Sequence, residues 1–429
     1  MKTQHTKTPT SILQTDFYEL TMSYAYLMLE RAGEKTGFES FIRKIKPNIT
    51  DKDFYIFDGE NEINDFMSKI KEEISNESCF FERFWEMISN KVDIKNYEIC
   101  KKEFMKMDKN FEYSVLKNGD RVYPKVPVFQ FNGPKMIGQL LETPITNIIN
   151  GRVGMKSYNK EIELISNEVT EDYKKMIDKR ARQYRDSTKK IILEAGYRRS
   201  ANFEIACYAS MSAIKNGWNG TSNTCLFNVI DKNLINGTMA HAFIMSYGTE
   251  KNEIKAFKDW NNIFPNSTLL IDTYDSVKAV KKLIENNIKP NAVRIDSDPI
   301  EKIAHEVRII LDNAGWDEVK IFLSGDITPE KLIKWDGDNV PFDICMAGTK
   351  FVNIGEVENI NPGFVYKVVE YKKDGKTFYP VKKAEGKSNY PGLKKIHRNY
   401  DQLIVESKNN YFGIEKDIDY SKIKEVVFI

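Results

Sequence analysis

Short apolar runs alternate with amphipathic stretches along the second half of the chain. The apolar runs are STLLID, NAVRIDS, VKIFLSGD and FDICMAGT, and the stretches between them cover residues 275–286, 300–313 and 328–335. Each run has the length of a buried strand, and each stretch repeats its apolar residues at helical spacing. Repeated strand–helix units predict a parallel sheet, and their number favours an irregular parallel α/β barrel.

The ends of the chain have a different pattern. Residues 16–30 predict a helix that Asp16 caps, GFESFIRKI predicts a strand, and residues 60–118 predict several amphipathic helices. Strand-like segments return near the C-terminus in FVYKVVEY, KTFYPVKK and EVVFI. The pattern therefore predicts a second domain of α/β (α+β) type, which the N-terminal region forms together with the C-terminal tail.

These patterns divide the chain into two predicted domains. We assign residues 1–135 and the segment 360–429 to the N-terminal domain, and residues 136–359 to the barrel. The charged segment 155–193 within the barrel domain predicts one long helix or a helical pair.

Composition excludes several classes of protein. The 429 residues carry 64 Lys and Arg against 62 Asp and Glu, a net charge of only +2, so no general attraction to nucleic acid or an anionic membrane is expected. The five cysteines and four histidines have no zinc-ligand spacing. A polar start and the absence of a long apolar run predict a soluble, cytoplasmic protein, in which any anion site is local.

Candidate chemistry gathers where the predicted barrel strands end. Carboxylates follow the strands at Asp272, Asp296 and Asp326, and basic or glycine-rich segments accompany them at Arg198, Arg294 and the turns SGD and AGT. Backbone N–H groups at such turns bind phosphate, and arginine binds phosphate or carboxylate through two hydrogen bonds. Carboxylates beside a phosphate site hold Mg²⁺ or ribose hydroxyls. The set indicates a sugar phosphate or pyrophosphate ligand, although barrel aldolases and isomerases use similar parts.

Several stretches, in the same order along the chain, resemble the nicotinate phosphoribosyltransferase family. They are TDFYELTM at 15–22, LLETPITNIIN at 140–150, GYRR at 196–199, GTSN at 220–223, GTMAH at 237–241, VRIDS at 293–297, GT at 348–349 and PGLKKIHR at 391–398. The resemblance implies a type II phosphoribosyltransferase fold and a homodimer with shared active sites. It also implies an enzyme that makes nicotinate mononucleotide and pyrophosphate from nicotinate and phosphoribosyl pyrophosphate, in the biosynthesis or salvage of NAD.

The resemblance also implies a role for each matching residue. His241 would be phosphorylated by ATP, which is a co-substrate, and Asp272 and Asp296 would orient it or hold ribose and Mg²⁺. No tightly bound organic cofactor is implied. Roles in substrate binding fall to Tyr18, which would stack on the base from the neighbouring subunit, and to Arg198, Thr221, Ser222, Arg294 and Ser297. Binding of the 5′-phosphate falls to Gly325, Asp326, Gly348 and Thr349.

Three positions bear on the choice of substrate. Ser222 stands where the related nicotinamide-using enzymes carry an aspartate, which would repel a carboxylate, so Ser222 favours nicotinate. Ala195 replaces a phenylalanine expected to face Tyr18 across the base, and Asp298 stands where the family's loop has a glycine. The alternatives left open are a nicotinamide phosphoribosyltransferase and a ligand-binding relative without catalysis.

Overall fold

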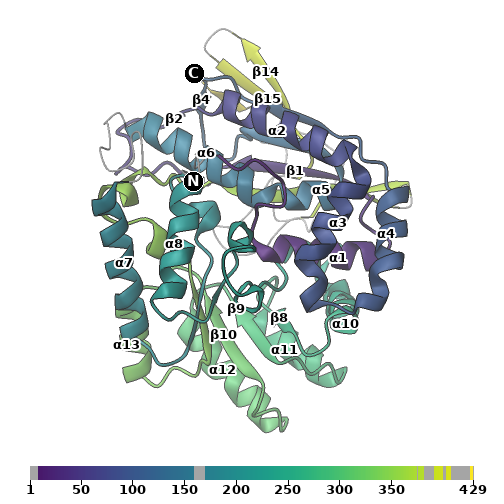
Figure 1. Cartoon of the computed structure of the whole chain (residues 1–429), viewed down its shortest axis with the longest axis vertical. Helices are drawn as coiled ribbons and strands as arrows, with labels where there is room; N and C mark the ends of the chain where they lie inside the picture. Colours follow the sequence, from purple (N-terminus) through teal and green to yellow (C-terminus); the bar gives the residue numbers. More distant parts are fainter. Residues whose placement is uncertain are drawn as a thin grey trace.

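A computed structural model describes residues 8–158, 170–373, 375–380, 391–399, 402–406 and 426–428. Within these residues the chain forms a curled parallel sheet surrounded by helices and a separate antiparallel sheet (Figure 1). In Figure 1 strands β8, β9 and β10 and helices α11, α12 and α13 occupy the lower part, and β1 of the antiparallel sheet lies above them. One hydrophobic core cluster includes side chains from both parts, among them Phe38 and Leu323.

The parallel sheet has six strands in the order β7-β6-β11-β10-β9-β8. Their bounds are β6 Ile191–Glu194, β7 Gly220–Thr221, β8 Thr268–Leu270, β9 Ala292–Ile295, β10 Lys320–Ser324 and β11 Ile344–Ala347. Strands β8 to β11 are neighbours in chain order, as right-handed strand–helix–strand units require. The described ladder does not join β7 to β8, so the sheet is a half-barrel, and the predicted fold class is confirmed.

The helices of the half-barrel follow the predicted spacing. Helix α12 spans Ile300–Asn313, the range that the pattern predicts, and buries Ile300, Ala304, Val307 and Leu311 against the strands. Helices α11 Ser276–Glu285 and α13 Pro329–Gly337 begin at side-chain caps from Asp275 and Thr328. The remaining helices of this part are α7 Glu171–Asp186, α8 Phe203–Lys215, α9 His241–Met245, α10 Glu253–Ile263 and α14 Thr349–Val352.

The antiparallel sheet joins the two ends of the chain. Its order is β13-β12-β1-β5-β3, so the C-terminal strand β12 pairs directly with the N-terminal strand β1, with Phe41 opposite Val365. The bounds are β1 Lys35–Phe41, β3 Glu112–Val115, β5 Phe129–Pro134, β12 Val365–Lys373 and β13 Lys376–Phe378. This pairing accords with the expected contribution of the C-terminal segment, while the domain boundaries themselves remain predictions.

Helix α1, Phe17–Met28, lies between the two sheets (Figure 1). It is buried along most of its length and packs against α3, α4 and α5 from the N-terminal part and α10 from the half-barrel. The bounds of the other N-terminal helices are α2 Glu60–Ser75, α3 Glu77–Ile88, α4 Tyr97–Lys106, α5 Lys135–Leu140 and α6 Glu142–Tyr158. Its central place means that residues at its N-terminus can reach the ends of the barrel strands.

Three smaller pieces complete the description. The charged segment 155–193 contains the end of α6, then α7 and the start of β6, while residues 159–169 lie outside the described residues. Two strands, β2 Tyr55–Ile56 and β4 Arg121–Val122, form a short antiparallel pair. Near the C-terminus β14 Lys395–Asn399, β15 Gln402–Glu406 and β16 Val426–Phe428 form a three-stranded sheet.

Candidate active site

A cavity of about 740 Å³ opens at the carboxyl ends of the half-barrel strands. It receives residues from α1, from α6, from β12 and from the loops that follow β6, β7, β9, β10 and β11. All of the predicted site residues line it except Asp272 and Ser297; those that do are Tyr18, Arg198, Thr221, Ser222, His241, Arg294, Asp296, Gly325, Asp326, Gly348 and Thr349. Segments separated by more than 300 residues in sequence therefore meet in one place.

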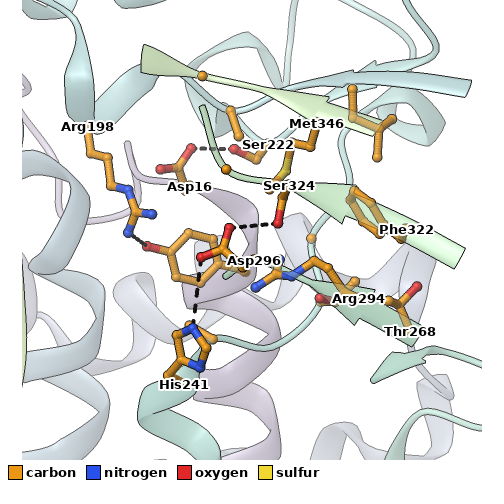
Figure 2. Close-up of a pocket in the computed structure, with 18 of the residues that line it drawn as sticks. Asp16, Arg198, Ser222, His241, Thr268, Arg294, Asp296, Phe322, Ser324 and Met346 are labelled. Carbon is orange, nitrogen blue, oxygen red and sulfur yellow. Dashed lines mark hydrogen bonds and ion pairs between the residues drawn. The ribbon is translucent and has the colours of Figure 1, made fainter. Parts of the chain in front are cut away.

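His241 is the first residue of α9 and faces two carboxylates. Its Nε2 lies 3.9 Å from Asp272 Oδ1. The same atom lies 3.9 Å from Asp296 Oδ2 (Figure 2). Its Nδ1 lies 3.1 Å from Thr273 Oγ1, so the two ring nitrogens have different partners. This arrangement suits a histidine whose tautomer is set by one neighbour and whose charge is stabilised by others.

Hydroxyl groups hold these two carboxylates in place. Ser297 Oγ donates a short hydrogen bond to Asp272 Oδ2, and Ser324 Oγ donates to Asp296 Oδ1 at 2.7 Å. Asp272 is 5% exposed and stands behind the cavity wall, and its Oδ1 accepts no hydrogen bond from the described residues. Ser297 is therefore placed to position Asp272, from outside the cavity lining.

The two carboxylates and His241 form the acidic cluster whose ligand atoms all lie within 4.8 Å of one another. Burial acts to raise the pKa of Asp296, but His241, the guanidinium of Arg294 and the hydroxyl of Ser324 outweigh it and hold the pKa well below its usual range. Asp296 is therefore a stable anion at neutral pH, as a group that orients a histidine or holds a divalent cation must be.

Arg294 projects from β9 into the half-barrel. It donates from Nη2 to the backbone oxygen of Met239 at 3.1 Å, while its Nε has no hydrogen-bond partner among the described residues. Burial lowers the pKa of Arg294, and the carboxylates of Asp296 and Asp272 oppose that shift. A buried guanidinium with a free N–H inside a cavity is a ready partner for an anionic ligand.

Tyr18 and Arg198 lie together on the opposite side of the cavity. Arg198 Nη1 donates to Tyr18 Oη at 3.1 Å and to Glu142 Oε1 at 2.6 Å. The side chain of Arg198 is 35% exposed, whereas the side chain of its partner Glu142 is only 8% exposed. Tyr18 thus lines the cavity of its own chain. The carboxylate of Glu142, to which the sequence motifs assign no role, holds Arg198 in place.

The prediction that the Asp16 side chain caps α1 is wrong, because this side chain makes no capping hydrogen bond at the start of the helix. It accepts a short hydrogen bond from Ser222 Oγ and a second from Thr143 Oγ1 at 2.8 Å (Figure 2). Its position in the TDFYELTM stretch was the only signal for a role in the site. The structure therefore places a buried carboxylate directly on Ser222.

A second buried carboxylate supports the loop that carries Arg198. Glu194, at the end of β6, accepts hydrogen bonds from Gly196 N at 2.5 Å, Ser210 Oγ at 2.7 Å and Thr221 Oγ1 at 2.6 Å. Burial raises the pKa of Glu194 to about 7, although these three donors oppose the shift. Thr221 is predicted to bind substrate, but its hydroxyl donates to Glu194. In this structure Thr221 therefore helps to hold the Glu194 carboxylate in place.

The turns predicted to bind phosphate lie at the ends of β10 and β11. Gly325 has φ +102° and Asp326 φ +44°, so the SGD turn runs through left-handed conformations that glycine adopts without strain. Gly348 and Thr349 stand at the start of α14 and line the same cavity. Both turns thus expose backbone to one space, as the prediction requires.

Two arginines that the motif reading did not assign add positive charge to this wall. Arg43 and Arg199 both line the cavity, and Arg43 Nε has no hydrogen-bond partner among the described residues. Burial, with the charges of Arg198 and Arg43, lowers the pKa of Arg199 to about 10. Arg43 lies within the predicted strand GFESFIRKI, just beyond the end of β1, and only that place beside the sheet could have suggested it.

Comparisons with known proteins agree with this arrangement. Residues 13–150 match the sequence model of the nicotinate phosphoribosyltransferase (NAPRTase) N-terminal domain. The chain is 25% identical to nicotinate phosphoribosyltransferase pncB2 of Mycobacterium tuberculosis, covering 91% of this chain and 76% of that protein. It is 26% identical to nicotinate phosphoribosyltransferase of Bacillus subtilis, covering 70% and 57% respectively.

The fold is shared with solved structures. Nicotinate phosphoribosyltransferase of Porphyromonas gingivalis superposes with a TM-score of 0.66 at 19% identity, covering 89% of this chain and 96% of that one. A putative nicotinate phosphoribosyltransferase of Saccharomyces cerevisiae superposes with a TM-score of 0.65, also at 19% identity, covering 88% and 94%. In the part of the chain that the structure describes, no helix is both long enough and apolar enough to cross a membrane.

A half-barrel with a cavity at its strand ends, joined to an antiparallel sheet domain, is the fold that the chain shares with these solved structures. Over residues 13–150 and along most of its length, the chain is similar to nicotinate phosphoribosyltransferases.

Proposed function

We propose that the protein transfers the ribose 5-phosphate group of phosphoribosyl pyrophosphate to nicotinate, giving nicotinate mononucleotide and pyrophosphate. One observation carries the proposal: Tyr18, Arg198, His241, Arg294 and Gly348, from five separate stretches that resemble the family, line a single cavity. The printed functions of the relatives in Mycobacterium tuberculosis and Bacillus subtilis support the same reaction.

The reaction is a displacement at C1 of the ribose. The lone pair of the pyridine nitrogen forms the new C1–N bond, and the electron pair of the breaking C1–O bond leaves with pyrophosphate. No proton transfer is needed, so the residues act by positioning and by charge. Tyr18 and Arg198 would hold the base, Arg294 and Arg43 would bind anionic groups of the sugar phosphate, and the SGD and AGT turns would receive the 5′-phosphate.

Asp272 and Asp296 fit a divalent cation. Both are oxygen ligands close together, and Asp272 Oδ1 is buried and accepts no hydrogen bond from the described residues. These two residues would hold Mg²⁺, which neutralises charge on the leaving pyrophosphate when bound.

His241 is the proposed link to ATP. With Nδ1–H donating to Thr273 Oγ1, Nε2 would carry the lone pair that attacks the terminal phosphorus of ATP, which breaks the bond to ADP and forms phosphohistidine. Water later hydrolyses that phosphohistidine to phosphate during turnover. On the basis of the family resemblance, the proposal includes a cytoplasmic homodimer that acts in the biosynthesis or salvage of NAD. Sedimentation of the purified protein tests whether it is a dimer.

A second candidate base is nicotinamide. Asp16 favours it, because a carboxylate on Ser222 can accept the amide N–H and repels a carboxylate ligand. The test is mononucleotide formation from phosphoribosyl pyrophosphate and Mg²⁺ with each base, with and without ATP, in the wild-type protein and in His241→Ala. Product from nicotinate, with ATP stimulation that His241→Ala loses, supports the proposal; product from nicotinamide alone overturns the choice of base.

A further inference from the structure

Three carboxylates and one guanidinium form a buried cluster beneath the base side of the cavity. Asp16, Glu19 and Glu142 are 1%, 0% and 6% exposed, and Arg198 is the cation paired with one of them, Glu142. With all three acids ionised the cluster carries two negative charges in excess. A pyridine carboxylate that binds at Arg198 adds a third, in a region where water screens little.

The three carboxylates of the cluster have different partners. Glu142 is paired with Arg198 at 2.6 Å, and Asp16 accepts hydrogen bonds from the hydroxyls of Ser222 and Thr143. Gln139 Nε2 donates to Glu19 Oε2 at 2.6 Å and to Glu142 Oε2 at 3.2 Å, and Thr143 Oγ1 donates to Glu19 Oε1 at 3.5 Å. No cation of the described residues lies within 4 Å of Glu19.

The titratable and charged groups around Glu19 are mostly acidic or phenolic. They are Asp16 just before α1, Tyr18 and Tyr26 on α1, Glu142 on α6 with Arg198 beyond it, and Tyr366 on β12. Burial raises the pKa of Glu19 well above its usual range, and the charge of Glu142 adds to the shift. The cluster is also short of donors, since the buried Gln139 Oε1 has no hydrogen-bond partner among the described residues.

We infer that Glu19 is a specificity-determining residue whose protonated form allows a negatively charged pyridine base to bind beside Arg198. The inference rests on the proposed function. Protonated Glu19 leaves the cluster with one excess negative charge, whereas ionised Glu19 leaves two and repels the nicotinate carboxylate. Affinity for nicotinate therefore falls as pH rises through the ionisation of Glu19, while affinity for the uncharged nicotinamide does not change.

The experiment compares the two bases from about pH 6 to about pH 9, a range that keeps nicotinate ionised. The KM for nicotinate is measured at saturating phosphoribosyl pyrophosphate, and nicotinamide is measured as a competitor through its Ki. In the wild-type protein we expect the KM for nicotinate to rise by up to about tenfold as Glu19 ionises with rising pH, and the Ki for nicotinamide to stay constant.

Glu19→Gln keeps the shape of the side chain but cannot ionise, so its KM for nicotinate stays low and independent of pH. Glu72→Gln, on the exposed face of α2, is the matched control and should follow the wild type. Retention of the pH dependence in Glu19→Gln, or an equal pH dependence for both bases, overturns the inference alone. If the variant does not fold, the comparison of the two bases in the wild type decides. Absence of nicotinate turnover at every pH overturns the proposed function and the inference with it.

Discussion

Ser222 Oγ donates a short hydrogen bond to Asp16 Oδ1, joining residues that are 206 positions apart in the chain. The sequence alone presents Ser222 as the loss of a carboxylate from the base site. The structure shows that Asp16 brings a carboxylate back to the same place. Selection between an acid and an amide base therefore depends on whether Asp16 is protonated or ionised. Burial raises the pKa of Asp16, which favours its protonated form.

Ala195 offers a direct test of the base pocket. It lines the cavity where the family resemblance leads us to expect an aromatic residue facing Tyr18. Ala195→Phe should restore that second aromatic surface, worth about 1 kcal/mol of stacking, and lower the KM for nicotinate about fivefold. Steady-state kinetics with Ala195→Leu, which adds apolar volume without a ring, separates stacking from simple filling. A higher KM in Ala195→Phe would show that the pocket holds the base elsewhere.

Arg198 should not tolerate replacement by lysine. Its guanidinium contacts Glu142 and Tyr18 from one nitrogen and leaves the other N–H groups for a ligand. Arg198→Lys keeps the charge but loses this geometry, so we expect kcat/KM for nicotinate to fall by about two orders of magnitude, or roughly 3 kcal/mol.

The control for Arg198→Lys is Arg182→Lys, on the exposed face of α7, which should change neither kinetics nor stability. The free energy of unfolding of Arg198→Lys should fall by about 1 kcal/mol, because Glu142 keeps a cation nearby. A variant with normal kcat/KM would remove Arg198 from the base site.

Stability should respond to pH through Glu194. The pKa of Glu194 is about 7 in the folded protein and about 4.3 in an unfolded chain, so the folded state binds more protons between these values. Stability from this group is therefore fully present below about pH 4.3 and is lost as pH rises to about 7. Between pH 5 and pH 8 the loss should be about 3 kcal/mol.

Urea denaturation of the wild type and Glu194→Gln at both pH values measures this contribution. The difference between the two proteins should change by about 3 kcal/mol in favour of the variant from pH 5 to pH 8, since other groups cancel. Glu285→Gln is the matched control, because Glu285 is exposed. Glu34→Gln would not serve, because Glu34 is ion-paired with Arg31. An unchanged difference would mean that Glu194 is ionised throughout.

The sequence predicted the half-barrel well because each of its units is local. The stripe of α12 and the apolar run of β10 each appear within about fifteen residues, and strand–helix order fixes their neighbours. The pairing of β12 with β1 was expected only in outline, because two strands more than 300 residues apart carry no signal of register.

Site residues were predictable where a motif names them and were missed where only the fold brings them in. His241 and Arg294 stand within GTMAH and VRIDS, but Glu142, Glu194 and Arg43 reach the site through contacts with other segments. Asp16 was assigned to a helix cap because that is the usual local role of an aspartate at that position. A partner 206 residues away, Ser222, took its side chain instead.

Thr273 should determine which tautomer His241 adopts. Its Oγ1 lies 3.1 Å from His241 Nδ1, and it is almost fully buried. Thr273→Val keeps the shape but removes the hydrogen bond, so the reactive tautomer loses about 1–2 kcal/mol of preference. We expect ATP stimulation to fall about tenfold while the rate without ATP is unchanged, and Thr273→Ser to restore it. Equal loss of both rates would indicate a general structural role.

Gly237 connects the GTMAH loop to α1. A Cβ at this position would lie 2.3 Å from Tyr18 N and 2.8 Å from Phe17 C, and neither backbone atom can move without shifting Tyr18. Gly237→Ala should therefore displace His241 and Tyr18 together, which lowers both the nicotinate reaction and its stimulation by ATP. The expected loss of unfolding free energy is about 2–3 kcal/mol, as for other overpacked sites.

Gly337→Ala is the matched control for Gly237→Ala, because a Cβ there meets no atom within 4 Å and its φ is ordinary. It should leave activity unchanged and change stability by no more than about 1 kcal/mol. Thermal unfolding and the two-base activity assay, applied to both variants, separate the cases. If Gly237→Ala retained full ATP stimulation, the loop would have moved without carrying His241, and the close approach to Tyr18 would not couple the base site to the histidine.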